Sequence, residues 1–500
     1  MTTPLKTAAS PRRKADIAGI HPLTAQQQGV LFHARETGDG GEDPYFSLDV
    51  IVLEGAVDAD MLQVAWADAV ARHPILRSDF RWEDVPSPLQ IVFRTRPATL
   101  ERLDWRGEPD PDTALSRYQA ERRSVGFDLA HAADPRLTLI QLSGQRWFLL
   151  WAYHHIAVDG WSYAVVLRDL LASYEARLQG VSPNLPPARS FVDYLAWLGR
   201  QDTPGAEAFW QRQLRDFDAP TPLPLQRPDR STGSRWAEFG LPVASGERLR
   251  SFVARERITL NTLVQGLWGL LLSRLNACDR VVFGITVSGR PADLPGAEDM
   301  AGLFITSLPL QLSLRGGQRV GDWLRELQAQ NAELRQHEHL PLARVLTQAP
   351  AGTRALFDSL LVVENFPVDE ALKSRHGSLR ARPYDAPSQD GVARATSGRN
   401  NYPLTLVFVP GDTPRLVFAY DRHRFDDLAV RALGAQAQTL LEAMLAGADA
   451  PLDSLGLATQ HEGEQDRHAR ERQRISCTNR QRQLELEQRA RHQPRKRERQ

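Results

Sequence analysis

Apolar residues follow two different periods on either side of residue 155. Upstream, residues 147–152 are continuously apolar and rich in aromatic side chains, which predicts a strand buried on both faces. Downstream, Val166 and Leu170 recur at helical spacing, with Ser162 placed to cap the first turn. The pattern therefore predicts a central strand that ends where a helix begins.

The same alternation of short apolar strands with amphipathic helices runs through most of the chain, and this order predicts an α/β fold. Five hundred residues exceed what one hydrophobic core usually serves, so two lobes are expected. A proline-rich stretch places the boundary between them near Pro183 to Pro187. Strands are expected over 46–53, 75–80, 137–142, 281–287 and 416–421, and helices over 58–70, 261–275 and 428–445.

Charge and composition exclude several classes of protein. The 61 basic and 61 acidic residues balance, which gives no overall attraction to nucleic acid or to an acidic membrane. Two cysteines, Cys278 and Cys477, are too few for a disulfide framework or a zinc site, and they indicate a reducing, cytoplasmic setting. No apolar run approaches the roughly 20 residues of a membrane span. The last 40 residues hold 12 basic and 7 acidic side chains and cannot bury a core.

Two adjacent histidines, His154 and His155, close the predicted strand. Neighbouring residues on an extended backbone point to opposite sides, so only one of the pair can face a substrate. A neutral imidazole is the usual side chain for moving a proton near pH 7, and a strand end holds it rigidly. Satisfied structural histidines are the simpler interpretation of the pair alone. Asp159 is open to three interpretations: an acid, a metal ligand or half of an ion pair.

The heptapeptide from His154 to Gly160 fits the pattern His-His-x-x-x-Asp-Gly. It resembles the signature of condensation domains of nonribosomal peptide synthetases and of related acyltransferases that use coenzyme A thioesters. Further segments resemble the condensation-domain pattern in the same order over residues 20–455. They are 21–33, 72–80, 191–197, 288–291, 302–309, 337–342 and 357–367.

The resemblance implies an α/β fold of two lobes, each similar to chloramphenicol acetyltransferase, in a V-shaped pseudo-dimer with a channel between them. Residues 20–183 would form the N-terminal lobe, which carries the signature. Residues 184–457 would form the C-terminal lobe together with the connection between the lobes. Residues 1–19 are expected to be a flexible lead-in, and residues 458–500 a basic, disordered tail.

By resemblance, the candidate catalytic residues are His155, His154, Asp159 and Gly160 of the signature. His155 would orient the nucleophile and accept or relay its proton, while His154 would brace the loop. In this family an arginine pairs with the signature aspartate, and this role falls to Arg290. Elementary electrostatics agrees, because a buried carboxylate needs a partner. The resemblance also places Trp161, Ser288, Thr306 and Ser307 along the channel.

Two segments depart from the family pattern. Thr306 stands where asparagine is common, so the extra amide donor is lost and a substrate contact at this position is left open. Residues 337–339 read His-Glu-His, but the spacing does not fit a zinc-binding helix and no third ligand follows, so no metal site is expected. The sequence also carries no fingerprint of nucleotide binding and no serine-hydrolase elbow.

The resemblance implies a condensation enzyme of nonribosomal peptide or hybrid polyketide biosynthesis. It would join a carrier-bound acyl or peptidyl thioester to an acceptor amine or hydroxyl, giving an amide or an ester. No cofactor would be bound permanently, since the phosphopantetheine arm belongs to a partner carrier protein. The sequence has no Gly-Gly-x-Ser attachment segment, so a free-standing monomer that meets its donor carrier in trans is expected, with a small-molecule or carrier-bound acceptor.

Two alternatives remain from the sequence. An epimerisation domain shares the signature, and a non-catalytic carrier-docking module would keep the fold without needing His155. The identities of donor and acceptor, the stereochemical preference and the role of the tail are left open.

Overall fold

The computed structural model describes residues 14–36, 43–131, 136–225, 236–364, 368–373, 379–384 and 402–456. By their packing these residues form two compact units. Unit 1 takes the described residues of Met1–Asp202, Ser288–Thr306 and Phe366–Asn401, and unit 2 those of Thr203–Val287, Ser307–Asn365 and Tyr402–Gln500. Each unit combines a sheet with helices, so the two-lobed α/β fold is confirmed. The V-shaped arrangement and the channel stay predictions.

The units are not two consecutive stretches of chain, as a boundary near Pro183 to Pro187 implied. Unit 1 continues to Asp202 and also takes two later segments. One of these adds β12 (Arg380–Pro383) to the sheet edge, because it pairs antiparallel with β2 (Phe46–Glu54). Such long-range pairing leaves no trace in local hydrophobic patterns. The lead-in expected over 1–19 also ends earlier, because η1 (Lys14–Asp16) and β1 (Ile17–Pro22) lie within it.

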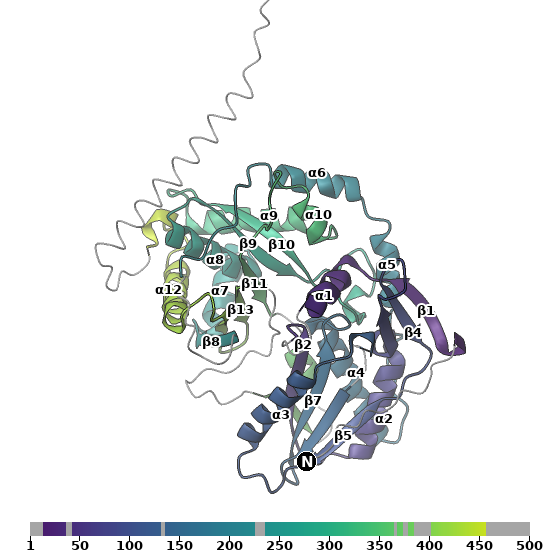
Figure 1. Ribbon diagram of the computed structural model, residues 1–500. Helices are drawn as coiled ribbons and strands as arrows, with labels where there is room; N and C mark the ends of the chain where they lie inside the picture. The colour runs from purple at the N-terminus through teal and green to yellow at the C-terminus, as the bar shows by residue number, and fades with distance from the viewer. Residues whose placement is uncertain are drawn as a thin grey trace, which may run out of the picture. The chain divides into compact units, whose positions relative to one another are not determined.

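The main sheet of unit 1 has the order β12-β2-β7-β6-β5, with β7 at its centre (Figure 1). Helices α2 and α4 pack on one face and α3 on the other. Side chains of β7 alternate between these two cores, so the strand is buried on both faces, as its continuous apolar run predicts. The further elements are β7 (Arg146–His154), β6 (Arg136–Gln141), β5 (Thr99–Asp104), α2 (Ala59–Arg72), α3 (Pro111–Val125), α4 (Gly160–Leu178) and α11 (Val368–Lys373).

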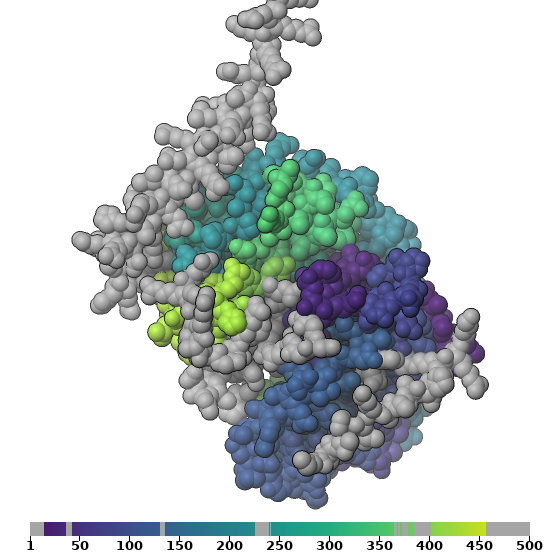
Figure 2. All heavy atoms as spheres, viewed as in Figure 1, coloured from purple at the N-terminus to yellow at the C-terminus, as the bar shows by residue number. Residues whose placement is uncertain are grey.

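A smaller sheet of order β1-β4-β3 completes unit 1. Helix α1 begins with a capping box, in which Gln27 N donates to Thr24 Oγ1 (3.2 Å) and Thr24 N donates to Gln27 Oε1 (3.0 Å). The helix lies at the visible surface in Figure 2, drawn in purple. The elements are α1 (Ala25–Glu36), η2 (Pro74–Arg77), β3 (Ser78–Arg81), β4 (Leu89–Phe93), η3 (Leu129–His131), α5 (Phe191–Leu198) and η4 (Ala297–Asp299).

The prediction of a strand over 75–80 is correct only for residues 78–80. Residues 74–77 form the turn η2, and only the residues after it enter β3. Pro74 explains the difference, because its fixed φ suits the first position of a helical turn. The Ile75 and Leu76 side chains are still buried, so hydrophobicity alone did not distinguish the two conformations.

Unit 2 is built on a six-stranded sheet of order β10-β9-β11-β13-β14-β8. Its core includes α8, which is apolar almost all round, as the sequence predicts for a buried helix. In the described part of the chain, no helix is long and apolar enough to cross a bilayer. The elements are α6 (Thr203–Gln213), β8 (Trp236–Pro242), α7 (Gly246–Glu256), α8 (Leu260–Asn276), β9 (Arg280–Val287), β10 (Thr306–Ser313), α9 (Val320–Arg335), α10 (Leu342–Leu346), β11 (Ser359–Val363), β13 (Leu404–Val409), β14 (Arg415–Asp421), α12 (Asp427–Ala446) and η5 (Leu452–Ser454).

Shortening a β7 side chain should destabilise unit 1 strongly. Phe148 is fully buried, and replacing such a ring by alanine typically costs about 3–5 kcal/mol. We expect Phe148→Ala to lower the urea midpoint of the transition that reports unit 1. Val125→Ala, at a position 62% exposed, is the control and should leave the midpoint almost unchanged. Equal midpoints for both variants would contradict the placement of β7 between two cores.

Candidate active site

The signature forms a tight loop between β7 and α4. The strand ends at His154, and the helix begins at Gly160. Asp159 is the N-cap, because its Oδ1 accepts the backbone N–H of Ser162 at 2.7 Å. The cap expected at Ser162 is therefore wrong: aspartate also satisfies a free N–H at a helix start, and it stands one position before the helix. The Ser162 hydroxyl instead donates to the carbonyl of Gly302 at 2.7 Å.

His154 is turned into the protein and is fully buried. Its Nδ1 accepts the backbone N–H of Ile156 at 3.0 Å, so its proton lies on Nε2. That nitrogen contacts Asp43 Oδ2 at 2.9 Å. Burial raises the pKa of Asp43, but the hydrogen bond and the electrostatic interaction with the His154 ring outweigh it, and the net shift is downward. Both ring nitrogens are thus occupied by protein groups, which leaves His154 as a support of the loop.

His155 lies on the opposite side of the backbone and is partly exposed. Its Nδ1 lies 3.0 Å from the carbonyl of Val158. A carbonyl only accepts, so Nδ1 carries the proton and Nε2 presents a lone pair. Burial, and then the neighbouring His154, lower the pKa of His155 to about 4. The ring is therefore neutral near pH 7, with Nε2 as its basic atom.

The Asp159 carboxylate is almost completely enclosed, with 1% of its side chain exposed. Oδ2 accepts two backbone N–H groups, from Phe304 at 3.0 Å and Ile305 at 3.3 Å. Oδ1 accepts a hydrogen bond from Nη2 of Arg290 at 3.2 Å, in addition to the one from the backbone N–H of Ser162. Four donors converge on this anion. Asp159 therefore holds chain segments together and does not point toward an open surface.

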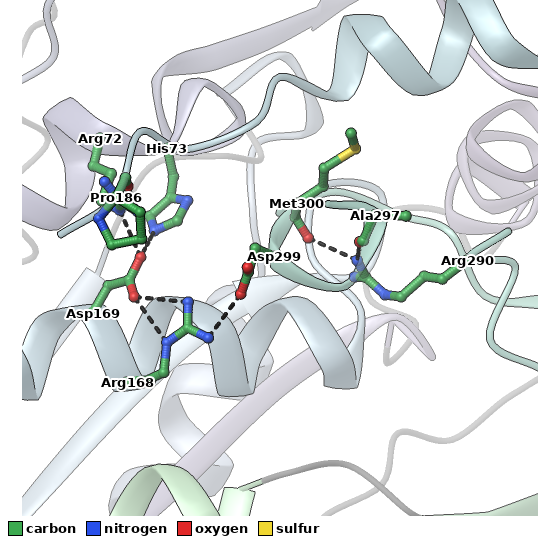
Figure 3. A network of polar contacts seen from close by, with 9 residues as sticks. All are labelled: Arg72, His73, Arg168, Asp169, Pro186, Arg290, Ala297, Asp299 and Met300. Atoms are coloured by element: carbon green, nitrogen blue, oxygen red, sulfur yellow. Dashed lines mark hydrogen bonds and ion pairs between the residues drawn. The ribbon is translucent and has the colours of Figure 1, made fainter. Parts of the chain in front are cut away.

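Arg290 connects the Asp159 carboxylate to the turn at residues 297–300, which follows Arg290 in the sequence. Its Nη1 donates to the carbonyls of Ala297 (2.5 Å) and Met300 (2.8 Å), as Figure 3 shows. Its guanidinium carbon also lies 4.0 Å from the centre of the Phe304 ring. These contacts fasten segment 288–306 to the loop of the two histidines. The pair proposed from the family resemblance is thus brought together by the structure.

A second attachment of the same segment starts from α4. Arg168 reaches from Asp169 (3.0 Å) to Asp299 (2.8 Å), as drawn in Figure 3. Asp169 also accepts Nε of Arg72 (2.7 Å) and contacts His73 (3.0 Å). Burial raises the pKa of Asp169, but these partners bring it down to about 2. Arg72, in the family-like segment 72–80, therefore supports the scaffold.

The other proposed site residues occupy different environments. Gly160 and Trp161 form the partly exposed first turn of α4. Ser288, in unit 1, and Ser307, in unit 2, are also partly exposed, whereas Thr306 is 6% exposed. Their place along a channel stays a prediction.

Three residues of the site were not identified from the sequence. Asp43 braces His154, and Ser47 Oγ lies 3.0 Å from Nε2 of His155. Gln27 Nε2 donates to the carbonyl of Ile156 at 3.1 Å, which ties α1 to the signature loop. Gln27 lies within the first family-like segment, which was a usable signal. Asp43 and Ser47 had none, because each is more than 100 residues from its partner.

The His-Glu-His segment lies in unit 2, whereas the signature residues belong to unit 1. The His337 ring stacks on Phe209, with centroids 4.2 Å apart. Burial raises the pKa of Glu338 to about 7. The described ranges contain no group of three or more metal-ligating side chains close enough to hold an ion.

A neutral histidine at a strand end, a braced neighbouring histidine and an enclosed Asp–Arg pair make up the loop that carries the His-His-x-x-x-Asp-Gly signature of acyltransferases. The family model for the condensation domain matches residues 17–465, so the chain belongs to the condensation-domain family. Condensation domains are acyltransferases that form amide bonds.

The relatives are large synthetases. A linear gramicidin synthase of Brevibacillus parabrevis is 36% identical over 457 residues, which cover 90% of this chain and 6% of that protein. A chondramide synthase of Chondromyces crocatus is 34% identical over 494 residues, which cover 90% of this chain and 12% of that protein. The chain thus spans only a small part of these relatives' length.

Solved structures share the fold. The first condensation domain of the calcium-dependent antibiotic synthetase, in complex with a substrate analogue, matches with a TM-score of 0.72 at 19% identity, over 88% of this chain and all of that chain. The X-domain from teicoplanin biosynthesis matches with a TM-score of 0.69 at 24% identity, over 87% of this chain and 97% of that chain. At these identities the likeness concerns the fold alone.

Removing the arginine of the enclosed pair should destabilise unit 1. Arg290→Ala leaves a buried carboxylate without its counter-charge, which typically costs about 3–5 kcal/mol. We expect a lower melting temperature for Arg290→Ala and for Asp159→Ala by calorimetry. Arg106→Ala removes the exposed contact with Asp104 and should melt like the wild type. The pairing is refuted if all three variants melt alike.

The pKa of His155 predicts a specific pH dependence. Its ring protonates near pH 4 when folded and near 6.5 when unfolded, so the unfolded chain binds more protons between these values. The contribution of His155 to stability is therefore constant above about pH 6.5 and falls as the pH drops toward 4. Histidine NMR, assigned with His155→Ala, should show the ring titrating near pH 4. A midpoint near pH 6.5 would contradict the lowered pKa of His155.

Proposed function

We propose that this protein joins a carrier-bound acyl or peptidyl thioester to an acceptor amine or hydroxyl, with His155 as the group that orients the nucleophile and takes its proton. The observation that carries the proposal is the state of the His155 ring. It is neutral, its tautomer is fixed by Val158, and Nε2 has the lone pair. Asp159 and Arg290 support the loop and take no part in proton transfer.

The reaction balances with these groups alone. The acceptor nitrogen or oxygen attacks the thioester carbonyl, and its proton passes to Nε2 of His155. Collapse of the tetrahedral intermediate breaks the carbon–sulfur bond, and the imidazolium protonates the departing thiolate. The products are an amide, or an ester for a hydroxyl acceptor, and the free thiol of the phosphopantetheine arm. Holding both reactants in line can lower the barrier by about 7–11 kcal/mol.

The low pKa of His155 narrows its role. An imidazole with a pKa of about 4 is too weak a base to deprotonate an ammonium group or a carbon acid efficiently. It can accept a proton from nitrogen once attack on the carbonyl has made that nitrogen positively charged. This argues that the acceptor amine arrives neutral.

We further propose that the donor carrier is met in trans, and that the acceptor is a small molecule or a second carrier. The relatives named above are peptide synthetases, which favours a peptide product over a hybrid polyketide. These 500 residues contain no Gly-Gly-x-Ser segment to which a phosphopantetheine arm could be attached. The cytoplasmic location stays a prediction.

A docking role is the second candidate. An X-domain of the same fold has been solved as a complex with OxyB from teicoplanin biosynthesis, so this fold also serves protein binding. A protein that only docks partners has no use for a fixed imidazole tautomer. The signature geometry therefore favours catalysis.

Replacing His155 should abolish product formation without unfolding the protein. The Asp159–Arg290 cluster holds the signature loop without the help of the His155 ring, so His155→Ala is expected to melt close to the wild type. Purified protein is mixed with a donor-loaded carrier and candidate amines or alcohols, and the products are identified by mass spectrometry. A variant that turns over like the wild type would remove His155 from the mechanism.

Two controls complete this experiment. Protein truncated near residue 460 should remain active with the separate carrier if the tail is dispensable; activity only with the intact tail would identify a docking element there. Deuterium exchange into a carrier-bound aminoacyl thioester, without product formation, would establish epimerisation instead.

A further inference from the structure

Among the described residues, Ser47 is hydrogen-bonded to the basic nitrogen of His155. It lies on β2 and is 2% exposed, and its Oγ is 3.0 Å from His155 Nε2. Because Nδ1 donates to Val158, Nε2 has no proton in the neutral ring. The hydrogen bond therefore runs from the Ser47 hydroxyl to Nε2. Ser47 and Val158 together hold both edges of the ring.

The Ser47 hydroxyl has a second acceptor within reach. Ser47 and Tyr153 are directly opposite each other in the antiparallel pair β2 and β7. The Tyr153 hydroxyl donates its own proton to Asp49 Oδ2 at 2.8 Å, and the Ser47 hydroxyl lies near enough to act on the pKa of Tyr153 in the downward direction. Its remaining lone pair can therefore accept the proton of Ser47. The Tyr153 ring also meets the His155 ring edge-on, with centroids 5.5 Å apart.

We propose that Ser47 is a positioning residue that holds His155 Nε2 before the substrate binds and releases it by turning its hydroxyl to Tyr153. The inference rests on the proposed function, since it assigns a purpose to the lone pair of His155. A nitrogen lone pair accepts one strong hydrogen bond at a time. The substrate N–H or O–H therefore has to displace the Ser47 hydroxyl from Nε2.

Tyr153 lowers the free-energy cost of this exchange. A buried hydroxyl that loses its only acceptor bears a large part of its desolvation cost. When Ser47 turns to Tyr153, its proton remains hydrogen-bonded, and the chain from Ser47 through Tyr153 ends at the Asp49 carboxylate. No proton is gained or lost by these three residues. The exchange alters only the direction of one O–H bond, and His155 is presented to the substrate in a single tautomer.

A double-mutant cycle tests this coupling. Ser47→Ala removes the hydroxyl and should lower kcat by about tenfold, the lower end of the loss seen when the hydrogen-bond partner of a metal-ligating histidine is removed. Tyr153→Phe leaves the Ser47 hydroxyl without its second acceptor, so it should lower kcat in the presence of Ser47. The same substitution should have little effect in the Ser47→Ala background. Ser47→Thr, which keeps the hydroxyl, should restore most of the activity.

A matched control separates this role from general loss of a buried hydroxyl. Ser173, also buried in unit 1, donates to Asp68 at 2.6 Å, outside the signature loop. Ser173→Ala should leave kcat unchanged. Additive losses in the cycle, or an unchanged kcat in Ser47→Ala, would overturn the proposal.

Nitrogen-15 NMR of the histidine rings gives a readout that does not depend on turnover. In the wild type, His155 should show a protonated Nδ1 and an Nε2 shifted by a hydroxyl donor. In Ser47→Ala the shift of Nε2 should be lost, while Nδ1 stays protonated because the Val158 carbonyl still accepts its proton. Identical spectra would overturn the role of Ser47. Failure of the wild type to form product with any carrier would instead count against the proposed function, and the NMR result would still decide the contact.

Discussion

The enclosed Asp159 carboxylate is the interaction on which the site depends. A buried anion is tolerated only when donors surround it, and here four converge from the start of α4, Arg290 and the backbone at 304–305. The same anion caps the helix and fixes a segment that is 131 to 146 residues distant. The loop with both histidines is therefore held at its C-terminal end by charge, and at its N-terminal end by β7.

The two histidines have different roles because the backbone directs their side chains to opposite sides. His154 uses both nitrogens on protein groups, Ile156 and Asp43, so it contributes rigidity. His155 uses Nδ1 on a backbone carbonyl and keeps Nε2 as an acceptor. Each hydrogen bond fixes a tautomer, and the two tautomers are opposite. The signature therefore specifies one supporting ring and one basic ring, which chemical composition alone does not distinguish.

Local hydrophobic patterns predicted much of the fold, but they predicted few of the contacts around the two histidines. The apolar run of β7 and the periodicity of α4 and α8 predicted these elements, because burial imposes a period on the sequence. The resemblance supplied the pairing of Asp159 with Arg290. Nothing local predicted β12 in the first sheet, or Asp43 and Ser47 beside the histidines. These contacts depend on pairing between distant strands, which sets neighbours without leaving a periodic signal.

Burial makes His155 a weak base, and this constraint explains why its surroundings are so well ordered. The environment that lowers its pKa to about 4 also keeps it neutral, so its lone pair is always available near pH 7. The cost is a small driving force for proton transfer, which leaves most of the rate enhancement to alignment of the reactants. Alignment in turn requires that the ring cannot rotate or change tautomer. Val158 and Ser47 at the ring edges, and the Asp159 cluster behind the loop, meet that requirement with neutral or fully compensated groups.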